Sequence, residues 1–67
     1  MSIAKVIEVI GEGDTIEAAI KNAVKEAGKT LHGIKQINVK YIEALVDNNN
    51  VTKFRVNAKL TFVIEKS

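Results

Sequence analysis

The sequence contains no cysteine, so disulfide bonds cannot stabilise its fold, and a single histidine gives no basis for a structural zinc site. With 67 residues, the chain is expected to form one domain, residues 1–67. A domain of this size buries only about 60% of the surface that its unfolded chain exposes. Small domains usually compensate with disulfides, a metal or oligomerisation. Of these three means of stabilisation, only oligomerisation is left, and we therefore expect the chain to pack on copies of itself.

Long hydrophobic runs are also missing, since the longest contain two or three residues, as at Ala44–Val46 and Phe62–Ile64. No segment could cross a membrane, and the first residues lack the apolar core of a signal peptide. These observations predict a cytoplasmic protein without a membrane partner.

Positive charge is modest, with a net charge of +2, which is weak evidence for a nucleic-acid partner. Lys53, Arg55 and Lys59 would share one face of a strand. A sheet that binds RNA needs aromatic side chains on such a face for base stacking, and this stripe has none. We therefore expect no nucleic-acid partner.

The most regular pattern in the chain lies between Phe54 and Ile64, where six apolar residues alternate with mostly polar ones. This period of two predicts a strand with one buried face. A shift of register by one residue would turn all six apolar side chains outward, so the register is tightly specified.

The first half of the chain predicts a strand and a helix. Ile3–Ile10 is rich in β-branched residues and carries apolar side chains on both faces, and residues 11–13 are expected to form a turn. Asp14 or Thr15 would cap the following helix; with Asp14 as the cap, Glu17 would complete a capping box. Helical spacing of apolar residues predicts about five turns, with Gly33 as the C-terminal cap. That apolar stripe consists of Ile16, Ala19, Ile20, Ala23, Val24, Ala27 and Leu31.

A second extended segment runs from Ile34 to Val46, and its apolar parity changes after Tyr41, which indicates a bulge or bend. Residues 47–50 (Asp-Asn-Asn-Asn) predict a turn into the last strand. The fold class is therefore α+β with the order β-α-β-β. An all-antiparallel sheet then requires the last strand to lie between the other two, giving the order 1-3-2, with the helix packed on its apolar face.

No residue pattern requires a reaction. His32 stands alone at a helix end, which favours a structural or solvated role. Residues 11–13 lack the remaining glycine and the lysine of a phosphate-binding loop. Glu43, Asp47 and the asparagines at 48–50 could offer oxygen ligands to calcium, but a plain turn is favoured because their spacing differs from that of an EF-hand. With no paired acid and base, the chain is not expected to be an enzyme.

Four stretches, Lys5–Gly11, Ala18–Val24, Ala27–Ile34 and Thr52–Phe62, resemble the dodecin family. The resemblance covers nearly the whole chain. It implies a β-α-β-β subunit, twelve copies of which form a hollow homo-dodecamer with trimers as sub-assemblies. It also implies a non-enzymatic protein that stores or buffers a flavin, so FMN, FAD and riboflavin are the family ligands.

The residues implied as the family's flavin site differ here. Family members place a flavin-stacking Trp where this chain has Gln36, and a ring-binding Gln where it has Arg55. The arginines that hold the phosphate in some bacterial members fall on Glu43 and Val63. We therefore take Gln36, Glu43 and Arg55 as the pocket positions and expect weak flavin binding or none. A flavin-free structural shell, or one that binds calcium, is the alternative.

Overall fold

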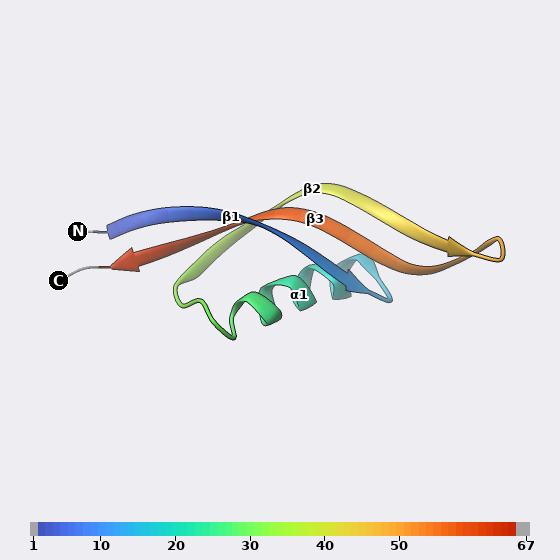
Figure 1. Cartoon of the computed structure of the whole chain (residues 1–67), viewed down its shortest axis with the longest axis horizontal. Helices are drawn as coiled ribbons and strands as arrows, with labels where there is room; N and C mark the ends of the chain where they lie inside the picture. Colours follow the sequence, from blue (N-terminus) through green and yellow to red (C-terminus); the bar gives the residue numbers. More distant parts are fainter. Residues whose placement is uncertain (1, 66–67) are drawn as a thin grey trace.

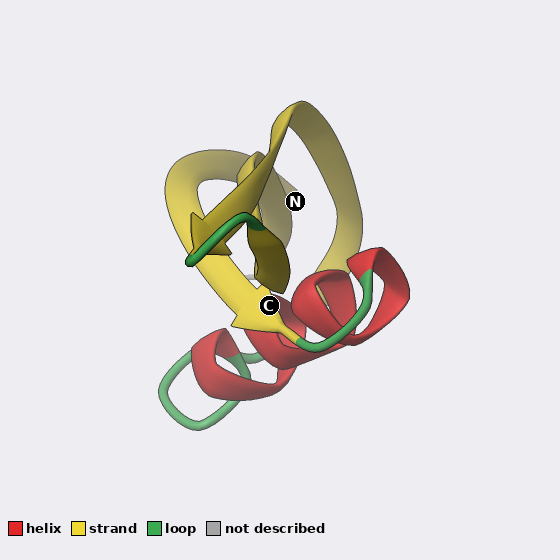
Figure 2. Cartoon of the chain, turned by 90° about the vertical axis from the view of Figure 1, so that its right-hand side faces the viewer, coloured by secondary structure: helices red, strands yellow, loops and turns green. Residues whose placement is uncertain are grey.

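One helix and three strands make up the fold, which a computed structural model describes for residues 2–65. Strand β1 spans Ser2–Gly13, helix α1 Ile16–Ala27, strand β2 Ile34–Asp47 and strand β3 Asn50–Glu65. The strands form one antiparallel sheet in the order β1-β3-β2, so the predicted topology is confirmed. Helix α1 lies against one side of this sheet (Figures 1 and 2).

The small core lies between α1 and the apolar side of β3, as the alternation in that strand predicted. Its six buried hydrophobic residues are Ala19, Ala23, Val56, Ala58, Leu60 and Phe62. Four of the six belong to β3, which is paired with a neighbouring strand on each side. The central strand is therefore the element on which the other three pack.

The turn predicted at residues 11–13 is wrong, because β1 continues through them to Gly13. Gly11 and Gly13 lie where the helix approaches the sheet most closely. A Cβ on Gly11 would collide with the carbonyl oxygen of Ala19 and would lie 2.7 Å from the Cβ of Ala23. These glycines therefore serve close packing rather than chain reversal.

The start of α1 is capped by Thr15, whose Oγ1 accepts a hydrogen bond of 3.0 Å from the N–H of Ala18. The alternative with Asp14 as the cap, and the capping box with Glu17, is therefore wrong. Thr15 has an extended backbone, as an N-cap residue normally does.

The helix is also shorter than predicted, since it ends at Ala27 after 12 residues and Gly28 is its C-cap. Hydrogen-bonded turns continue past that point, and the N–H of Leu31 still donates to the carbonyl of Ala27 at 2.9 Å. The chain thus keeps Leu31 near the helical stripe without a regular helix. Gly33, predicted as the cap, instead has a φ of +76° and accepts a hydrogen bond from the N–H of Val63.

The bulge predicted in the second strand is confirmed, because the register of β2 against β3 shifts between Val39 and Tyr41. Two further shifts, at Ile34/Gln36 and Leu45/Val46, were not predicted. The predicted turn at residues 47–50 is confirmed by the positive φ angles of Asn48 and Asn49, which suit a tight hairpin.

Much of the sheet extends beyond the helix. The molecule is 54 Å long, whereas 12 helical residues span about 18 Å. The β2–β3 hairpin projects past one end of α1, and the start of β1 and the end of β3 project past the other (Figure 1). Several apolar side chains there and along β1 are exposed: Ile3, Val6, Ile7, Ile10, Ile42, Val46 and Val51. No helix within residues 2–65 is long and apolar enough to span a membrane.

Replacing Gly11 with alanine should lower the free energy of unfolding by about 1–3 kcal/mol, because the new methyl group forces α1 away from β1. Denaturant unfolding followed by circular dichroism measures the change. The control is Gly28→Ala, since Gly28 has an ordinary helical φ of −65° and should change stability by less than about 1 kcal/mol. Equal stability of the Gly11 variant and the wild type would contradict the close packing.

Replacing Phe62 with aspartate should abolish folding and assembly together, because Phe62 is 8% exposed and the new carboxylate would be buried without a partner. The matched control, Phe62→Leu, keeps an apolar side chain and should stay folded. Circular dichroism and light scattering measure both properties. A soluble, folded Phe62→Asp monomer would be inconsistent with the core described above.

Candidate functional site

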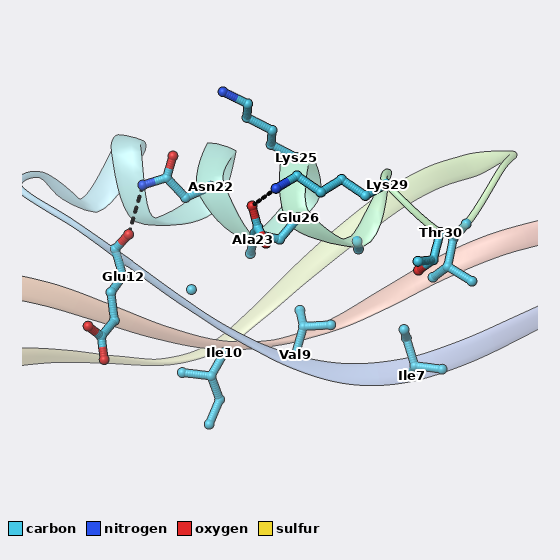
Figure 3. A pocket seen from close by; sticks show the side chains of 13 residues that line it. Ile7, Val9, Ile10, Glu12, Asn22, Ala23, Lys25, Glu26, Lys29 and Thr30 are labelled. Atoms are coloured by element: carbon cyan, nitrogen blue, oxygen red, sulfur yellow. Dashed lines mark hydrogen bonds and ion pairs between the residues drawn. The ribbon is translucent and has the colours of Figure 1, made fainter.

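The side of the sheet opposite α1 carries most of the polar side chains, and we call it the polar face. On β1, Glu12 stands between Gly11 and Gly13, which both point to the helix, so its own side chain points away from it. Figure 3 shows the same for Ile10, whose side chain points away from α1 while that of Val9 points toward it. The polar face includes Glu8, Glu12, Gln36, Asn38, Glu43, Arg55, Asn57 and Lys59.

Three charged residues cross the polar face in one row, because Arg55 on β3 is paired with Glu12 on β1 and with Glu43 on β2. The guanidinium of Arg55 donates two hydrogen bonds to one oxygen of Glu12, from Nε at 3.1 Å and from Nη2 at 2.9 Å. Both side chains are about two-fifths exposed. We call Glu12, Arg55 and Glu43 the charged row.

Amide side chains extend this polar network. Asn57 lies two residues after Arg55 on the same strand, and its Nδ2 donates to Oε1 of Glu43 at 2.8 Å. Further along β2, Nε2 of Gln36 donates to Oδ1 of Asn38, also at 2.8 Å. Before the bulge, β2 places the amides of Gln36 and Asn38 on the polar face. The bulge shifts the register so that Glu43 lies opposite Arg55, and a carboxylate joins these amides on the same face.

A shallow depression of about 490 Å³ lies beside the charged row. It is formed where β1 pairs with β3, and Asn57 both lines it and holds Glu43. The lining residues are Glu8, Val9, Ile10, Asn57 and Ala58. The depression therefore combines apolar area with hydrogen-bonding groups, as small-molecule sites do.

A second hollow, a groove of about 700 Å³, runs between α1 and the free edge of β1 (Figure 3). Nδ2 of Asn22 donates to the carbonyl of Glu12 at 2.8 Å and closes one end of it. Lys29 Nζ lies 2.8 Å from Oε2 of Glu26, and this hydrogen bond and the positive charge hold the pKa of the exposed Glu26 below its ordinary value.

The pocket positions predicted from the resemblance, Gln36, Glu43 and Arg55, all lie on the polar face, but only Glu43 and Arg55 lie side by side. Their role as ligand contacts stays a prediction. Sequence reasoning missed Glu12 and Asn57, which hold Arg55 and Glu43 in place. Glu12 could have been found only by treating residues 11–13 as strand, since its position between two glycines then puts it on the polar face.

The residues of the polar face do not fit a phosphorylated flavin. The guanidinium of Arg55 is already bound to Glu12, and a second carboxylate, Glu43, stands on its other side. At position 36, an amide bonded to Asn38 replaces a stacking ring. An unphosphorylated ring system meets no such conflict, because Gln36, Asn38 and Asn57 carry both donors and acceptors for its polar edge.

The cation site considered at Glu43 and Asp47 is not supported by the positions of these residues. They lie four residues apart along β2, which is about 13 Å in an extended strand. Two carboxylates at that separation cannot bind one ion. Within residues 2–65, no group of three or more His, Cys, Asp or Glu side chains could hold a metal ion.

Comparison with known proteins gives one family and a consistent set of structures. The family model for dodecin matches residues 3–65. A dodecin from Streptomyces coelicolor has 30% sequence identity and a TM-score of 0.90, and the match covers 98% of this chain and 96% of that one. An arginine-to-alanine variant of the Thermus thermophilus dodecin has 28% identity and a TM-score of 0.90 over the full length of both chains.

A third structure, dodecin from Streptomyces davaonensis, has only 20% identity but a TM-score of 0.91, with 97% of each chain covered, and supports the fold alone. A search of curated protein sequences gives no match. The strand order and the length of the chain agree with those of the matched dodecins, and the family model covers nearly every described residue. On these grounds, the chain belongs to the dodecin family.

Proposed function

We propose that this protein assembles with copies of itself into a hollow dodecamer that holds a small ligand without transforming it. Dodecins are known as small, oligomeric, flavin-binding proteins rather than enzymes. The observation that carries the proposal is the uncovered apolar surface on both sides of the sheet. Ile10 is 64% exposed on the polar face, and Ile42 is 52% exposed on the helix side beyond the end of α1.

Assembly would remove this apolar surface from water, at roughly 25 cal/mol for each Å² buried. A chain of 67 residues with six buried core residues has little other means of stabilisation. Both outer strands, β1 and β2, also have one unpaired edge within the subunit. Such edges are available for pairing with neighbouring copies.

The ligand is proposed to bind on the polar face, where the depression beside Asn57 lies next to the charged row. Gln36, Glu43 and Arg55 are the proposed contact residues. Binding between subunits would place this partly exposed face in a more enclosed environment, in which hydrogen bonds to a ligand are stronger than in water. The cytoplasmic location predicted from the sequence remains part of the proposal.

Replacing Ile42 with lysine should reduce the size of the assembly, because the ammonium group would have to be buried against a neighbouring copy. Sedimentation velocity at about 10 µM gives the mass of the wild type and the variant. An assembly with a dissociation constant of about 1 nM stays intact at this concentration. The control is Glu17→Gln, an exposed helix position with the same change in charge, which should leave the mass unchanged. An intact assembly of the Ile42 variant would argue against burial of this surface.

Replacing Gln36 with tryptophan should raise the affinity for riboflavin by up to roughly tenfold, because the new ring can stack on the flavin. Quenching of riboflavin fluorescence measures the dissociation constant. Gln36→Leu is the control, since it removes the same amide without supplying a ring. Equal affinities of the two variants would refute a ligand site at position 36.

The wild type can also be tested for the alternative function. Failure to bind flavins, together with a melting temperature that rises with calcium, would support the cation-binding alternative instead.

A further inference from the structure

The charged row is arranged so that two of the five N–H groups of its one guanidinium are already engaged. Nε and Nη2 of Arg55 both donate to a single oxygen of Glu12. A phosphate approaching the Nε and Nη2 side of Arg55 would have to displace that carboxylate, since the same two N–H groups form that fork. An anion could therefore reach only the outer N–H groups of Arg55, on Nη1 and Nη2, and it would approach them between two glutamates.

The other neighbour of Arg55 strengthens this effect. Glu43 is the partner of Arg55 on β2, and the Asn57 amide fixes its carboxylate on the polar face. The row thus holds two carboxylates and one guanidinium, with a net charge of −1. Next along the face, Glu8 and Lys59 are direct partners whose opposite charges balance, and exposed Lys53 lies one step away toward the hairpin.

The depression lies beside this row. Glu8 lines it directly, and Asn57, which also lines it, bonds Glu43, so a ligand seated there would meet one carboxylate and have a second behind Asn57. Ile10 supplies apolar area, and the amide of Asn57 supplies polar contacts at the rim. An uncharged heterocycle matches these groups, whereas a dianionic phosphate on the same ring system would be repelled by Glu43.

We propose that the charged row makes the polar face select uncharged ring ligands and reject their phosphorylated forms. The proposal rests on the proposed function, since it names the class of ligand for the same site. Riboflavin and FMN are matched probes, because they share one ring system and one side chain and differ only in the phosphate. In this chain, riboflavin binds more tightly than FMN, by about tenfold at low ionic strength.

The test is titration of the assembled protein with each flavin by fluorescence quenching, for the wild type and Glu43→Gln. The glutamine keeps an oxygen that accepts from Asn57 but removes the charge, so the affinity for FMN should rise several-fold relative to the affinity for riboflavin. The control is Glu17→Gln, which removes one charge from an exposed helix position paired with Lys21. This control should change neither affinity.

Salt gives a second readout that a steric effect would not produce. The preference for riboflavin should shrink between about 20 mM and 500 mM salt, because ions screen a repulsion between exposed charges. Equal or tighter binding of FMN by the wild type would overturn the proposal, as would an equal change of both affinities in Glu43→Gln. Failure to bind either flavin would also overturn this proposal about ligand choice. The proposed assembly is tested separately, by the mass from sedimentation velocity.

Discussion

The fold depends on a mismatch between one short helix and a long sheet. Helix α1 spans about 18 Å of a molecule that is 54 Å long, and the buried hydrophobic side chains of the sheet all lie on β3. The remaining apolar residues of β1 and of the β2–β3 hairpin stay exposed in the single chain. In the proposed assembly, copies of the same chain would cover this surface.

Within the subunit, close contact between α1 and β1 makes the small core effective. Glycines at 11 and 13 on the strand face alanines at 19 and 23 on the helix, so backbones approach where side chains would normally separate them. The sequence predicts the strand order and the buried face of β3, because alternation over eleven residues fixes them. It misplaces residues 11–13, since glycine pairs in a single sequence usually mark turns and their packing partners are distant in the chain.

The candidate site could be predicted from the sequence even less completely than the fold. The resemblance drew attention to Gln36, Glu43 and Arg55, but no local pattern indicates that Glu12 holds Arg55, because 43 residues separate them. Register shifts in β2 decide that Glu43 faces Arg55, and only one of the three shifts has a signature in the sequence. Long-range register, rather than residue type, thus determines which charges meet on the polar face and what ligand they would accept.

The central claim is that the isolated subunit is incomplete and that copies of the chain stabilise one another. The most direct measurement is the melting temperature of the wild-type protein over a hundredfold range of concentration, with the mass followed by light scattering. Coupled assembly and folding predict a multi-subunit mass and a melting temperature that rises with concentration. A 7.3 kDa particle that melts cooperatively at a temperature independent of concentration would contradict the account.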